Sequence, residues 1–139
     1  MTVEDLIEGG RLLRVEPDRR LVDELLATAR THTRSAEVLQ AKDPWASVVV
    51  ATAAVRGCLL AVLQTRGLAV APAADGGDTL LAALAELGDV PVDLPAVTAL
   101  LSQHRHGVST TVTATEVEDA LRLADATLSR VAAASPGEE

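Results

Sequence analysis

The chain has one long segment, residues 44–66, in which apolar residues follow one another almost without interruption. The segment has the length of a helix, begins at Pro44 and stops before Gly67. A helix that is apolar on every side must be surrounded by other helices or by lipid. Asp43 is the predicted N-cap and Pro44 the first helical residue. The segment is therefore predicted to be the central helix of a bundle.

The rest of the chain supplies helices with a single apolar face, because their apolar residues recur at spacings of three and four. These predicted helices span residues 3–8, 18–41, 79–87, 94–106 and 115–133. The apolar stripe of the 18–41 helix consists of Leu21, Val22, Leu25, Leu26, Ala29, Ala36 and Leu39. Residues 11–17 are predicted to be a connector, and residues 68–78, rich in Ala, Gly and Pro, a loop. The pattern predicts an all-α fold, an up-and-down helical bundle of five to six helices.

The ends of the later helices carry local signals. Asp93 is the predicted N-cap of the 94–106 helix. Thr115 and Glu118 have the spacing of a capping box at the start of the last helix. The stripe of that helix consists of Val117, Ala120, Leu121, Ala124, Leu128 and Val131. We expect one domain over residues 1–134 and a solvated tail over residues 135–139.

Composition limits the residue types that can fill the core and the classes of partner that the surface can bind. Apolar residues make up 48% of 139, yet the chain has no Phe, no Tyr and a single Trp, so the core must consist of Leu, Val and Ala. The only cysteine, Cys58, excludes an internal disulfide, and its apolar surroundings are typical of a core residue rather than of a nucleophile. The formal net charge of −8 opposes a general role in coating nucleic acid, which needs clustered Lys and Arg.

The apolar segment is also long enough to span a membrane. A span over residues 45–63 would place Arg56 near the bilayer centre, at a cost of about 2.5–3.5 kcal/mol. The first ten residues are acidic and show no signal-peptide pattern. We therefore expect a cytoplasmic protein without a membrane span.

Two places could carry chemistry. His104, Arg105 and His106 form the densest cluster of catalytically capable groups, at a predicted helix end. Two histidines two residues apart point in different directions on a helix, so they do not predict a shared metal. Cations at this position also cap a helix C-terminus, which is the other interpretation. Arg56, inside the apolar segment, needs a partner if buried; the sequence favours an ion pair with a neighbouring helix over a pocket or a subunit interface.

Three stretches carry a resemblance to a known family. They are residues 10–18 (GRLLRVEPD), residues 42–68 (from KDPW to RGL), and residues 101–124, where LSQHR is followed by a short polar loop and VEDAL. The chain resembles the HEPN superfamily, the higher-eukaryote and prokaryote nucleotide-binding domains, and in particular its small prokaryotic members. The resemblance covers nearly the whole chain.

The resemblance implies an up-and-down helical bundle that usually forms a homodimer. Many members are toxins or defence proteins that cut RNA without a metal, with an Arg followed after four to six residues by a His near the start of the last long helix. Members often pair with a minimal nucleotidyltransferase, which modifies a Tyr near that motif. The motif Arg falls on Arg105, but the positions for the His are Thr110, Thr111 and Val112, and the chain has no Tyr.

These residues lead to three hypotheses. The first is a non-catalytic HEPN-like component of a toxin–antitoxin or defence module, which acts by dimerisation and partner binding without RNase activity or cofactor. Arg56 and Arg105 are its candidate binding residues. The second is a metal-independent endoribonuclease toxin, in which Arg105 holds the phosphate and His104 or His106 acts as the general acid or base. The third is a generic helical-bundle scaffold.

Overall fold

The central apolar segment forms helix α3, Pro44–Thr65, in the computed structural model, which describes residues 1–72, 77–103 and 111–134. The helix begins as predicted, because the Asp43 carboxylate accepts a hydrogen bond of 3.1 Å from the backbone amide of Ala46. Its buried side chains are mostly small or aliphatic, and Val48, Ala54, Val55 and Leu59 are almost entirely shielded from solvent. The core of the protein is therefore built around α3.

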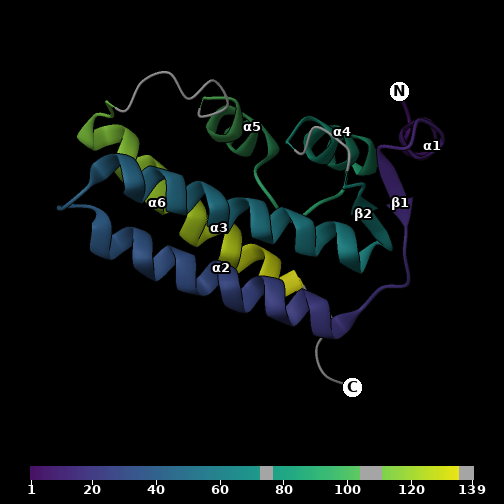
Figure 1. The fold of residues 1–139 in the computed structure, drawn as a ribbon, viewed down its shortest axis with the longest axis horizontal. Helices are drawn as coiled ribbons and strands as arrows, with labels where there is room; N and C mark the ends of the chain where they lie inside the picture. Colours follow the sequence, from purple (N-terminus) through teal and green to yellow (C-terminus); the bar gives the residue numbers. More distant parts are fainter. Residues whose placement is uncertain (73–76, 104–110, 135–139) are drawn as a thin grey trace.

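The order of elements along the chain is α1 (Val3–Glu8), β1 (Leu12–Arg14), α2 (Arg19–Leu39), α3, β2 (Leu68–Val70), α4 (Gly77–Leu87), α5 (Leu94–Gln103) and α6 (Ala114–Ala134). The three long helices α2, α3 and α6 pack side by side, and the shorter α4 and α5 lie along the other side of α3 (Figure 1). The described part thus has six helices and one small two-stranded sheet. The prediction of an all-α bundle of five to six helices is confirmed.

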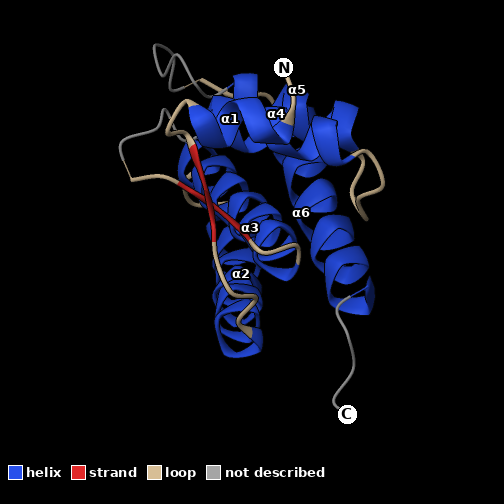
Figure 2. Cartoon of the chain, turned by 90° about the vertical axis from the view of Figure 1, so that its right-hand side faces the viewer, coloured by secondary structure: helices blue, strands red, loops and turns tan. Residues whose placement is uncertain are grey.

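The two strands are a correction to the sequence interpretation, which placed a connector at residues 11–17 and a loop at residues 68–78. β1 and β2 pair antiparallel, with Leu12 opposite Val70 and Arg14 opposite Leu68. They lie against α1 and the end of α3 (Figure 2). Three residues are too few for an alternating pattern to stand out, so the strands carried no periodic signal.

Two details of the long helices differ from prediction. The capping box of α6 is formed by Thr113 and Glu116: the Thr113 amide donates to the Glu116 carboxylate at 3.0 Å, and the Glu116 amide donates to the Thr113 hydroxyl at 3.1 Å. The predicted pair two residues later is wrong, although both pairs have the required spacing. On α2, Leu21 is 38% exposed and the polar Thr33 is buried in the stripe. Thr33 fits there because its hydroxyl donates to the carbonyl oxygen of Ala29 at 2.9 Å.

Among the described residues, α3 is the one helix long and apolar enough to cross a membrane, by length and composition. The structure buries 61% of that apolar window among the other helices. Burial of this extent is typical of the core helix of a soluble protein. The burial of α3 therefore agrees with the expectation that it packs inside a bundle.

Candidate functional site

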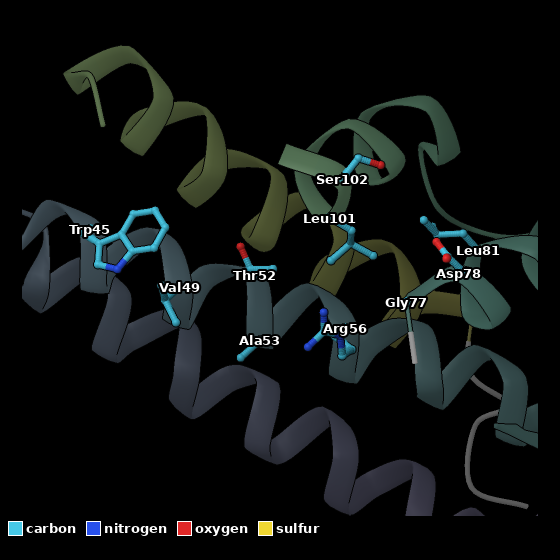
Figure 3. Close-up of a pocket in the computed structure, with 10 residues that line it drawn as sticks. All are labelled: Trp45, Val49, Thr52, Ala53, Arg56, Gly77, Asp78, Leu81, Leu101 and Ser102. Atoms are coloured by element: carbon cyan, nitrogen blue, oxygen red, sulfur yellow. The ribbon is translucent and has the colours of Figure 1, made fainter. Parts of the chain in front are cut away.

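A cleft of about 390 Å³ opens on the side of α3 that α2 and α6 do not cover (Figure 3). Its floor is one face of α3, and its far wall is formed by the first turn of α4 and the last turn of α5. The lining residues are Trp45, Val49, Thr52, Ala53, Arg56, Gly77, Asp78, Leu81, Leu101 and Ser102. This cleft contains one of the two binding residues that the sequence singled out, Arg56.

The α3 face in the cleft follows from the helical period. Trp45, Val49, Thr52 and Arg56 succeed one another at spacings of four, three and four, which places them along one face. Because α3 is apolar all round, the face that its neighbours leave uncovered is also largely apolar. Val49 is accordingly 45% exposed, an unusual value for a valine in the central helix of a core. The cleft is therefore the uncovered part of the core helix.

Arg56 is exposed, and its guanidinium forms no hydrogen bond or ion pair within the part of the chain that the structure describes. The predicted ion pair with a neighbouring helix is therefore wrong for the described residues. The physical reason is position: Arg56 lies on the open face, so water solvates its charge and no buried cation needs a partner. Of the alternatives that the sequence left open, the structure places Arg56 at a pocket (Figure 3).

The far wall is positioned by contacts outside the cleft. The guanidinium Nε of Arg11 donates a hydrogen bond of 3.0 Å to the hydroxyl of Thr79, which ties the start of α4 to the segment before β1. At the start of α5, the Ala96 amide donates to the Asp93 carboxylate at 3.2 Å, which confirms Asp93 as the N-cap. Leu101 is buried against the core while it lines the cleft. The bond from Arg11 fixes the start of α4, and the burial of Leu101 anchors the end of α5 that faces α3.

The described lining carries one cation and one anion. The cation is Arg56 and the anion is Asp78, in the first turn of α4. Asp78 also takes part in an interaction of its own. The hydroxyl of Thr52 donates to the backbone carbonyl oxygen of Val48 at 2.8 Å, so its proton is already engaged. The remaining lining is mostly apolar, and the arrangement is suited to holding a ligand.

Cys58 lies outside the cleft and is fully buried, as predicted for a core residue. Burial away from water raises the pKa of its thiol from 9.0 to about 11, because a thiolate is poorly solvated in an apolar core. Within residues 1–72, 77–103 and 111–134, no three His, Cys, Asp or Glu side chains come together as a metal site. Among the described residues, the candidate functional groups are therefore those that line the cleft.

The structure describes some of the predicted site residues and not others. His104, Arg105, His106 and Thr110 lie outside the described residues, so the proposed motif position stays a prediction. Sequence reasoning missed Trp45 as a site residue, although its spacing of eleven from Arg56 already indicated a shared helix face. It had no means of finding Asp78 or Ser102, which reach the cleft only through the packing of α4 and α5.

Comparisons with known proteins identify no relative of the chain. No protein-family model, no curated protein and no solved structure matches it.

Proposed function

We propose that this chain is a non-catalytic, HEPN-like binding component of a prokaryotic toxin–antitoxin or defence module. It acts in the cytoplasm as a homodimer, together with a protein partner for which the family resemblance implies a nucleotidyltransferase type. The observation that carries the proposal is the chemistry of the cleft, in which the Arg56 guanidinium has no hydrogen bond or ion pair with the described residues and lies among mostly apolar walls.

This chemistry favours binding over catalysis. Proton transfer at neutral pH needs a group such as a histidine within reach of the reacting atom. The described lining contains no His, Cys or Lys, and the Thr52 hydroxyl is committed to the Val48 carbonyl oxygen. Arg56 is therefore left to hold an anion, with the apolar walls to hold what is attached to it.

The sequence supports the same conclusion. The positions that the family resemblance assigns to the catalytic His are Thr110, Thr111 and Val112, and the chain has no Tyr for modification. A net charge of −8 weakens binding to RNA, since phosphate contacts depend on Lys and Arg. Both features support partner binding as the activity.

Self-association is supported by the open face of α3. Val49, on the long apolar helix α3, exposes 45% of its surface. Covering apolar surface of this kind removes it from water, which favours association. We propose a second copy of the chain as the partner that covers this face, because the second copy presents the same apolar surface.

The first test is induction of the chain alone in bacteria, followed by incubation of the purified protein with total RNA in the absence of metal. We expect normal growth and intact RNA. Growth arrest with RNA cleavage, both lost in Arg105→Ala or His106→Ala, would contradict the proposal and favour the nuclease hypothesis.

The second test is sedimentation of the purified protein at micromolar concentration. We expect a dimer, and we expect Val49→Glu to shift it to monomer because a carboxylate would be buried in the contact. Val38→Glu is the matched control, since Val38 on α2 is 66% exposed and is not among the described residues that line the cleft. A wild-type monomer throughout this range rules out the self-association that we propose.

A further inference from the structure

We infer that the cleft beside Arg56 binds a small organic anion with a single negative charge and an apolar body. The anionic group pairs with the Arg56 guanidinium, and the body lies along α3 toward Trp45 (Figure 3). This inference rests on the proposed function in one respect, that the cleft is a place of binding rather than of reaction.

The size and lining of the cleft fit a small molecule. Sites for such ligands occupy about 300–1,000 Å³ and combine mostly apolar walls with a few polar groups. The cleft measures about 390 Å³, and Val49, Ala53, Leu81 and Leu101 give it aliphatic surface on both sides. The small side chain of Ala53 leaves room between Trp45 and Arg56, so an elongated body can lie against the helix.

The charge of the lining limits the charge of the ligand. Arg56 is the one cation among the described lining residues, and Asp78 faces the same cleft. A guanidinium presents a planar fork that matches one carboxylate, sulfonate or phosphate group. Among the described lining residues, a ligand with several negative charges would meet one cation, Arg56, and the nearby Asp78 carboxylate, which repels it. The balance therefore favours a monoanion and disfavours polyphosphates.

The far end of the cleft suits an apolar body. Trp45 precedes Arg56 by eleven residues, which corresponds to about 16 Å along a helix axis at 1.5 Å per residue. Trp45 is half-buried and lines the cleft at the end opposite Asp78 (Figure 3). An indole offers an apolar ring on which aromatic or aliphatic groups can pack. A molecule with its charge at one end and its apolar part at the other matches this arrangement.

Trp45 also makes the binding measurable by fluorescence, because it is the only Trp of the chain and the chain has no Phe or Tyr. Intrinsic fluorescence therefore reports on one side chain in the cleft. The probes are anilinonaphthalene sulfonate, which is an apolar monoanion, and phenylnaphthylamine, which has the same ring system without the sulfonate. We expect the sulfonate to quench Trp45 emission saturably, and the neutral compound to bind about tenfold more weakly.

Variants assign the binding to Arg56. We expect Arg56→Gln to weaken binding of the sulfonate about tenfold, to the level of the neutral probe. Arg34→Gln is the matched control, because Arg34 is an exposed arginine of α2 outside the cleft. Circular dichroism of each variant establishes that the helices are retained.

The titration is made at two protein concentrations, below and above any self-association found by sedimentation. A second copy that covers the cleft then shows as weaker binding at the higher concentration, and failure of the dimer proposal leaves the titration unaffected. The inference is overturned if the sulfonate quenches Trp45 at neither concentration. It is equally overturned if both probes bind alike, or if Arg56→Gln binds as the wild type does.

Discussion

The hydroxyl of Ser47 donates a hydrogen bond of 2.6 Å to the backbone carbonyl oxygen of Ala36. Ser47 lies near the start of α3 and Ala36 near the end of α2, and both are fully buried. The bond therefore joins the two helices at the hairpin end where the chain reverses. It also satisfies the one polar side chain that the first turns of α3 bury.

Ser47→Ala should lower the free energy of unfolding by about 1 kcal/mol, the usual net contribution of a buried hydrogen bond. The matched control is Ser35→Ala on the exposed side of α2, because it makes the same change within a helix and loses no bond that the structure describes. Urea denaturation measures both. Equal unfolding free energies for the two variants would show that the bond contributes nothing.

Gly67 and Gly10 allow steric contact to be separated from backbone conformation. Both have positive φ, 73° and 74°, which costs a residue with a side chain about 1–2 kcal/mol. A Cβ at Gly67 would lie 3.1 Å from the carbonyl oxygen of Val15, whereas a Cβ at Gly10 would meet nothing within 4 Å. Gly67→Ala should therefore destabilise the protein more than Gly10→Ala, by about 1 kcal/mol or more. Denaturant titration measures the free energy of unfolding of both variants. Equal losses would mean that the backbone around Val15 moves aside at no measurable cost.

Cys58 should be unreactive in the folded protein at pH 8. Its pKa is raised to about 11 by burial, so little thiolate forms and a thiol reagent has no access. Ellman's reagent is expected to react at pH 8 only after denaturation. Rapid reaction of the native protein would show that α3 opens on the time scale of the assay.

The same shift predicts a pH dependence of stability. The folded pKa of Cys58, about 11, lies above the ordinary value of 9.0, so its contribution to stability is complete below pH 9. Above pH 9 the unfolded thiol ionises first, and stability falls as the pH rises toward 11. Cys58→Ala should show a flatter profile across this range when unfolding is followed by circular dichroism. Parallel profiles for the two proteins would contradict the assignment to Cys58.

Asp78→Asn should tighten binding of anilinonaphthalene sulfonate in the cleft. The change removes a negative charge that faces the same space as Arg56, and an effect of about 1 kcal/mol corresponds to about fivefold in affinity. Asp125→Asn, an exposed position on α6, should leave the affinity unchanged. The effect is expected to shrink as salt is added, because screening weakens exposed charges. Weaker binding by Asp78→Asn would show that the carboxylate itself contacts the ligand.

Local signals explain which elements the sequence predicted. The N-caps Asp43 and Asp93 were identified because a carboxylate that accepts from a nearby amide needs no distant contact. The capping box of α6 was misplaced because Thr113 and Thr115 are each followed three residues later by a glutamate. The two pairs are distinguished only by the residue at which α6 begins, and the packing of the helix sets that residue. The strands β1 and β2 were missed because each depends on the other, from far along the chain.

The sequence by itself determined the central helix, its ends and the composition of the core, because an apolar segment of that length must leave water. The helical period also placed Trp45, Val49 and Arg56 along one face. Only the tertiary structure decided that this face is the open one, since exposure depends on where α2 and α6 pack. It also brought Asp78 and Ser102 from distant parts of the chain to the cleft that Arg56 lines. Spacing along a helix is a local property, whereas a cleft exists only between elements.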